Sequence, residues 1–119
     1  MSDSIDSLVE QTANLGQRRV FAATAKGISF NWTRESGVSD YVGQLMLGMF
    51  DHVGERATPS QVTAQFKHAA DAAVFVAHND PMSDTEMTLD TARMFEKIAA
   101  EPLRYLEEAL ALGLVEEVN

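Results

Sequence analysis

The stretch HNDPMSDTEMTLD, residues 78–90, separates two helical sequence patterns. Pro81 cannot continue the helix that precedes it, and the neighbouring Asn-Asp pair favours a turn. The tetrapeptide SDTE fits a capping box, in which Ser83 and Glu86 would satisfy each other's free backbone amides. We therefore predict that one helix ends at about residue 78 and that another begins at residue 83.

The regions on either side carry helical patterns of their own. Thr58 and Gln61 form a second capping box with a proline between them, which predicts a helix over about 58–78. The next helix should run over 83–100, and a further one over 102–112 after the break at Pro102. The inner face of the first helix is rich in alanine, which allows close helix–helix approach. The inner face of the second is expected to comprise Met87, Thr91, Met94, Phe95 and Ile98.

The amino-terminal half contains both kinds of periodicity. Apolar residues at helical spacing predict a helix over about 4–15 and another over 39–53. Between them, an alternating pattern with β-branched and aromatic residues predicts a β-hairpin over 19–33, with strands at 19–24 and 28–33. Trp32 should then be largely buried against helices.

These elements predict one domain over residues 1–119 of the α+β class. It should be mostly helical, with four to five helices packed with one small antiparallel β-hairpin. Residues 114–118 fit either a short strand or a frayed tail.

Composition excludes several functional classes. The 119 residues include no cysteine, which rules out disulfides and thiolate metal sites and suits a reducing cytoplasm. The net charge of −9 disfavours direct nucleic-acid binding, because phosphate affinity requires clustered lysine and arginine. The apolar run at 41–50 is much shorter than the ~20 residues of a membrane span. We therefore expect a cytoplasmic protein without a membrane segment.

Carboxylates gather in the last third of the chain. This candidate acidic patch comprises Asp80, Asp84, Glu86, Asp90, Glu107 and Glu108. A calcium loop starting at Asp80 would need Gly at its sixth position and Glu at its twelfth, and the sequence has threonine at both. Helix capping accounts for most of these acids, so we expect neither a metal nor a cofactor.

Catalytic motifs are also missing from the sequence. None of the three histidines lies four residues from another, the spacing that places two imidazoles on one metal ion. Neither a nucleophile elbow nor a phosphate-binding loop is present. We expect no catalytic residues. The alternative is a small enzyme that uses His68, Asp71 or His78.

The predicted helix over 39–53 has more apolar residues than one core face requires. Its main stripe comprises Val42, Leu45, Met46, Met49, Phe50 and Val53. Tyr41 and Leu47 fall outside this stripe, as expected for a central helix or one at an interface. The candidate interface residues are therefore Tyr41, Leu47, Met46 and Phe50.

Together, these observations favour a small, acidic, non-enzymatic regulator or inhibitor that binds a protein target. Phages and mobile elements encode proteins of this size and composition. The predicted interface would serve a protein partner or a homodimer. Three alternatives stay open: an acidic nucleic-acid mimic that blocks a DNA-binding enzyme, the small His/Asp enzyme, and a structural oligomer or assembly component.

Overall fold

The computed structural model describes residues 18–30 and 37–118. These residues form an α+β fold that is mostly helical, as predicted. The elements in chain order are β1 (Val20–Ala23), α2 (Ala25–Ile28), α3 (Asp40–Met49), β2 (Arg56–Ala57), α4 (Pro59–Asn79), α5 (Thr85–Ala100), α6 (Pro102–Ala111) and β3 (Val115–Val118). The predicted helix over 4–15 and Trp32 lie outside the described residues.

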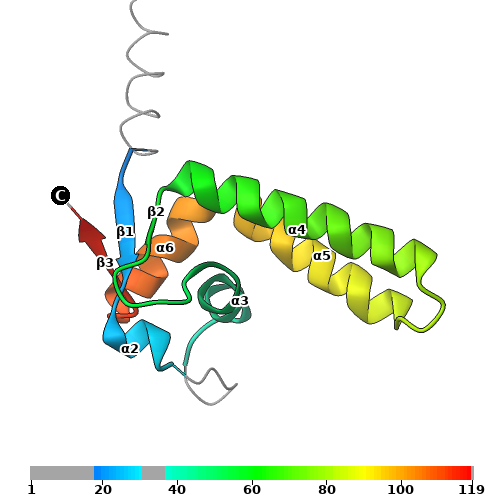
Figure 1. Ribbon diagram of the computed structural model, residues 1–119, viewed down its shortest axis with the longest axis horizontal. Coiled ribbons are helices and arrows are strands. Elements are labelled where there is room, and N and C mark those ends of the chain that lie inside the picture. The colour runs from blue at the N-terminus through cyan, green and yellow to red at the C-terminus, as the bar shows by residue number, and fades with distance from the viewer. Residues whose placement is uncertain (1–17, 31–36, 119) are drawn as a thin grey trace, which may run out of the picture.

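The described chain divides into a head and an arm (Figure 1). The head contains the three strands together with α2, α3 and α6. The arm, residues 59–100, is the antiparallel pair α4 and α5, which projects from the head. With 21 residues, α4 is about 30 Å long at 1.5 Å per residue, so the loop at residues 80–84 lies far from the sheet.

Strand β1 is the middle strand of the sheet, with β2 on one side and β3 on the other. Both pairings are antiparallel, and Phe21 lies opposite Ala57 on β2 and Glu117 on β3. The carboxy-terminal residues 115–118 are therefore a strand and not a tail.

The predicted β-hairpin over 19–33 is wrong in its second strand, as far as the described residues extend. Ala25–Ile28 is a short helix, because the Thr24 hydroxyl accepts a hydrogen bond from the Gly27 amide. The same hydroxyl donates to the carbonyl of Gly113, at 2.7 Å, and so ties this turn to the end of α6. The edges of β1 are occupied by strands from later in the chain.

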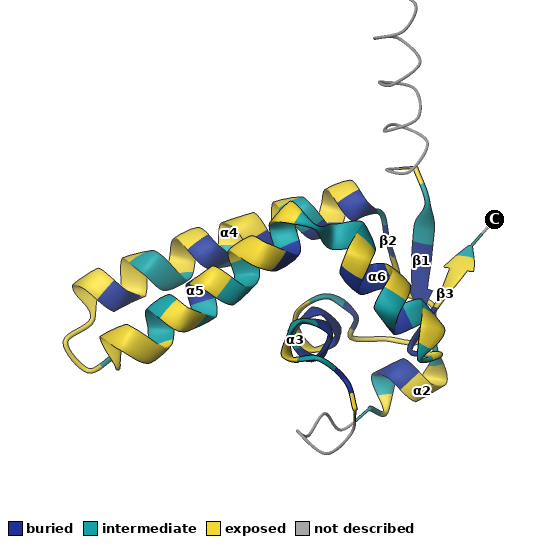
Figure 2. Cartoon of the chain, turned by 180° about the vertical axis from the view of Figure 1, so that it is seen from behind, coloured by how far each residue is buried: buried dark blue, intermediate teal, exposed yellow. Residues whose placement is uncertain are grey.

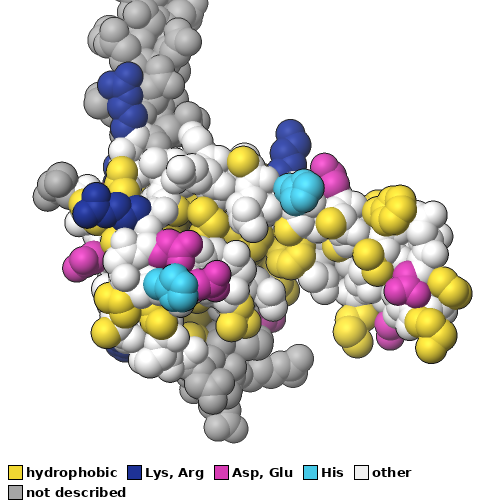
Figure 3. Space-filling model, in the orientation of Figure 1, with side chains coloured by type: hydrophobic (Ala, Val, Ile, Leu, Met, Phe, Trp, Pro, Cys, Tyr) yellow, Lys and Arg dark blue, Asp and Glu magenta, His cyan; other side chains and the backbone are white. Residues whose placement is uncertain are grey.

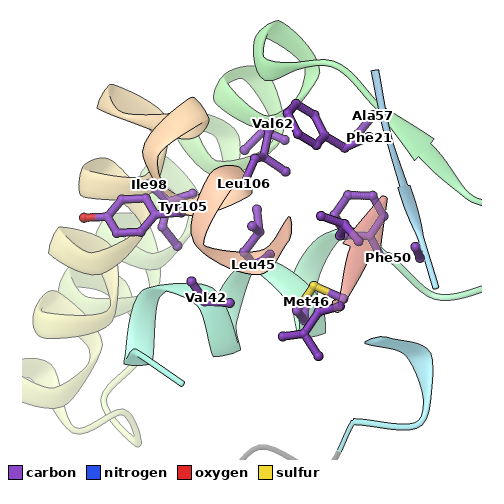
Figure 4. Packing of buried hydrophobic residues seen from close by; sticks show 14 of the residues in the cluster. Phe21, Val42, Leu45, Met46, Phe50, Ala57, Val62, Ile98, Tyr105 and Leu106 are labelled. Atoms are coloured by element: carbon purple, nitrogen blue, oxygen red, sulfur yellow. The ribbon is translucent and has the colours of Figure 1, made fainter. Parts of the chain in front are cut away.

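The core lies in the head and at the base of the arm (Figure 4). Large side chains that are fully buried come from β1, α3, α4, α5, α6 and β3, and include Phe21, Leu45, Phe66, Ile98, Leu106 and Val115. No polar or charged side chain is buried among the described residues. Hydrophobic burial therefore supplies the main stabilisation, at roughly 1.5–3 kcal/mol for each large side chain.

Helix α3 ends at Met49, four residues before the predicted end. The chain becomes extended at Phe50, and the Glu55 carboxylate then accepts hydrogen bonds from the amides of Asp51 and His52. Gly54 has a φ of +84°, which favours glycine, and its amide donates to the carbonyl of Ala23. This turn returns the chain to the edge of β1.

The two helices of the arm begin differently from one another. Thr58 and Gln61 form the predicted capping box of α4, with hydrogen bonds of 3.2 and 2.9 Å. The capping box predicted for Ser83 does not form. Instead, the Asp84 carboxylate caps α5 by accepting from the Met87 amide, and the Ser83 hydroxyl donates to the Asp80 carbonyl in the turn.

Gly27 provides a test of the packing of α2 against the end of α6. A Cβ at this position would lie 2.0 Å from the carbonyl oxygen of Leu114 and 2.8 Å from Cε of Met46. We predict that Gly27→Ala lowers the free energy of unfolding by more than about 2 kcal/mol, because the backbone must shift. Urea denaturation measures this change.

Gly48→Ala is the matched control. Its Cβ would lie 3.3 Å from a Phe66 ring carbon, and alanine favours the helix by about 0.5–1 kcal/mol, so the net change should stay within about 1 kcal/mol. Wild-type stability of Gly27→Ala would contradict the close approach of α2 to Leu114.

Candidate functional site

Exposed hydrophobic side chains concentrate at the far end of the arm. Six large hydrophobic residues of the described chain are exposed: Leu47, Val53, Phe75, Val76, Met82 and Met87. The last four lie within 13 consecutive positions, and we call them the tip surface. Met82 is 90% exposed, Phe75 67% and Met87 64%. In Figure 3, hydrophobic side chains at this end of the molecule have acidic side chains between them.

Small residues between α4 and α5 explain why the tip surface faces outward. Ala70, Ala77 and Ala92 are buried in the middle and outer part of the arm, whereas its large buried side chains, Val62, Phe66 and Ile98, lie nearer the base. Figure 2 shows that most of the far end of the arm is exposed. Phe75 precedes Ala77 by two residues, which corresponds to about 200° around the helix. Its ring therefore points away from α5.

The turn that carries the tip surface is held by its own hydrogen bonds. The Asp80 carboxylate accepts from the Met82 amide at 2.9 Å, and the Asn79 side-chain amide donates to the Phe75 carbonyl at 2.8 Å. The Ser83 amide also donates to the Asp80 carbonyl. The tip surface thus rests on an ordered chain reversal.

The candidate acidic patch is split between the two parts of the molecule. Asp80, Asp84, Glu86 and Asp90 lie at the end of the arm, in the loop and the first turns of α5. Glu107 and Glu108 lie on α6 in the head.

The two α6 carboxylates have partners within the head. Glu107 accepts from Arg19 at 2.8 Å, and Glu108 accepts from the Ser39 hydroxyl at 3.1 Å. Hydrogen bonds to Glu107 and Glu117 raise the pKa of Arg19. Arg19 therefore joins β1 to α6 and β3, and these acids serve the packing of the head.

The candidate interface on α3 contains two core residues. Met46 and Phe50 are each only 4% exposed, and Tyr41 stacks on Tyr105 with ring centroids 5.0 Å apart. Burial raises the pKa of Tyr105. Leu47 is 63% exposed and borders a hollow of about 180 Å³. That hollow is lined by Gly27, Ile28, Phe30, Met46, Leu47, Phe50 and Asp51.

The residues of the alternative enzyme site do not converge. His68, Asp71 and His78 are all exposed on α4, and the two histidines are separated by ten residues, about 15 Å along the helix. A hollow of about 370 Å³ between α4 and α5 includes Asp71, beside Lys67 and Glu96, but neither histidine. Residues 18–30 and 37–118 contain no group of three His, Cys, Asp or Glu side chains that could hold a metal ion.

Glu101 carries a perturbed carboxylate at the junction of α5 and α6. It accepts from Lys97 at 3.0 Å and from Arg104 at 3.4 Å. The hydrogen bond from Lys97 lowers the pKa of Glu101 and raises that of Lys97. These exposed groups are paired with one another where α5 gives way to α6.

Comparison with known proteins gives no match: no family model, curated protein or solved structure is similar to the chain. Among the helices of the described residues, none is long and apolar enough to cross a membrane. We therefore infer function from the exposed surfaces of the head and the arm.

Methionine oxidation tests the exposure of the tip surface. We predict that dilute hydrogen peroxide converts Met82 and Met87 to sulfoxides first, and Met46 last, because thioether oxidation follows solvent access. Peptide mass spectrometry at several times would measure the rates. If Met87 were oxidised as slowly as Met46, the tip surface would be covered in solution.

Proposed function

We propose that this chain is a non-enzymatic regulator or inhibitor that binds a protein target through the tip surface. The observation that carries the proposal is the concentration of exposed hydrophobic side chains on the end of a projecting helical pair. Such side chains act as anchors when they enter a groove on a partner. The proposal includes the cytoplasmic location expected from the cysteine-free sequence.

The composition of the tip surface supports this role. Two of its four side chains are methionines, whose flexible thioether chains adapt to differently shaped partner surfaces. A phenylalanine supplies a larger anchor with few rotatable bonds. The buried side chains that stabilise the fold lie elsewhere, in the head and along the inner face of the arm. The side chains of the tip surface are thus not required for the stability of the fold and are available for binding.

The α3 surface around Leu47 is a second candidate contact, for a homodimer or for a partner. It offers fewer exposed hydrophobic side chains than the arm, because Met46 and Phe50 are in the core.

Nucleic-acid mimicry receives less support from the arrangement of the acids. A mimic of the phosphate backbone requires a patch of carboxylates, whereas hydrophobic side chains alternate with the acids at the tip. The structural-oligomer alternative would use the same hydrophobic surface, with another assembly component as the protein partner.

A pair of double variants tests the proposal. Phe75→Ser/Met87→Ser removes two tip anchors, and Leu47→Ser/Val53→Ser removes two side chains of similar exposure from the head. We predict that the tip variant loses tenfold or more of its binding to proteins captured by the wild type, at ~1–4 kcal/mol for each anchor. The head variant should retain binding. Quantitative mass spectrometry of captured proteins measures both.

Thermal unfolding of both variants provides the control for folding. Each should melt within a few degrees of the wild type, because none of the four side chains is buried. Loss of capture only in the head variant would assign the contact to α3 and contradict the tip surface. Equal capture by all three proteins would contradict both surfaces.

A further inference from the structure

Exposed hydrophobic side chains on α4 have carboxylates one helical turn away. Asp71 precedes Phe75 by four residues, and Asp80 follows Val76 by four. Positions separated by four residues lie on the same side of a helix. A partner that covers either hydrophobic side chain must therefore also approach a carboxylate.

The same arrangement occurs on α5. Asp84 and Asp90 lie three residues before and three residues after Met87, again on the same side of the helix. Residues 71–92 contain five acidic side chains and no lysine or arginine. Arg93 follows directly and pairs with Asp90, so the other four acids, at positions 71, 80, 84 and 86, give the tip a net negative charge beside its hydrophobic anchors.

Extending the proposed function, on which this inference rests, we propose that the partner is a protein with an apolar groove flanked by lysine or arginine side chains. Binding an apolar anchor removes water from the acids beside it, and an unpaired carboxylate then loses solvation. Cations on the rim of the groove would replace that solvation and accelerate encounter.

A second copy of this chain fits the tip surface less well than a basic protein would. Two tips placed together would bring five acids against five. Several cations elsewhere are already paired with acids of their own chain: Arg19 with Glu107 and Glu117, Lys97 and Arg104 with Glu101, and Arg93 with Asp90. The charge pattern therefore favours a different, basic protein.

Two synthetic peptides test this inference on the full chain. Both are amphipathic helices with the same leucine face, flanked by lysine in one and by glutamate in the other. We predict that the lysine peptide binds at least about tenfold more tightly in fluorescence anisotropy at low salt, and that its affinity falls as sodium chloride is added. Phe75→Ser/Met87→Ser should abolish the difference, because the anchors bring the charges together.

Charge variants separate a local effect from the effect of net charge. Asp71→Asn/Glu86→Gln neutralises two tip acids that do not cap the helix or hold the turn. Asp51→Asn/Glu116→Gln makes the same change of net charge in the head. We expect the tip variant to bind the lysine peptide about three- to tenfold more weakly, and the head variant to bind like the wild type.

Several outcomes would overturn the inference. These are equal binding of the two peptides, no binding of the lysine peptide, and equal weakening by the tip and head charge variants. A dimer in light scattering that Phe75→Ser/Met87→Ser dissociates would show that a second copy occupies the tip. If the tip anchors are required for protein capture but the peptides are not discriminated, the charge inference fails while the proposed function stands.

Discussion

The contact between α4 and α5 is made by short side chains in the outer part of the arm, and the exposed surface of the protein depends on this constraint. Ala70, Ala77 and Ala92 are the fully buried residues along this contact, so the two backbones approach closely and larger side chains such as Val74 and Leu89 are only partly buried. Phe75 and Met87 consequently have no core to enter. Two helices alone cannot enclose a hydrophobic core, and a third surface is needed to cover these side chains.

The base of the arm is different, because the head provides that third surface. Phe66 and Ile98 are fully buried there, and Phe66 also contacts the ring of Phe95 at a centroid distance of 5.6 Å. Helix α3 packs against α5 and α6, and α6 leads directly into β3 at the sheet. Stability is thus concentrated in the head and the base, whereas the far end of the arm is available for an intermolecular contact.

Local signals in the sequence predicted α4, α5 and α6 to within two residues at each end. The capping box of Thr58 and Gln61 and the break at Pro102 each act within a few residues, so they can be read without the fold. The partners of β1 could not be read in this way. Val20 pairs with Val118, nearly the whole described chain away, and the two-residue strand β2 is too short to show a pattern. The hairpin over 19–33 was predicted incorrectly for the same reason, because local sequence does not reveal which distant strands pair with β1.

The candidate site was predicted in part. Acids at 80–90 were recognised, and Leu47 was correctly placed outside the stripe of α3, but the tip surface was missed. Phe75 falls outside the alanine-rich face of α4, and this was the available signal, whereas Val76 lies seven residues after Ala69, at the edge of that face. Met87 shares a helical face with Ile98, which is buried, so its exposure follows from the distance to the head and not from periodicity.

Site-specific photo-crosslinking tests whether the tip surface is the part of this chain that contacts a basic protein. A photo-reactive amino acid would replace Met87 in one sample and Leu47 in another, two positions of nearly equal exposure. We predict that the probe at position 87 forms a discrete adduct with one other protein, at an apolar segment flanked by lysine or arginine. The probe at position 47 should form no such adduct. Adducts from position 47 alone, or adducts at position 87 only with a second copy of the chain, would contradict this prediction.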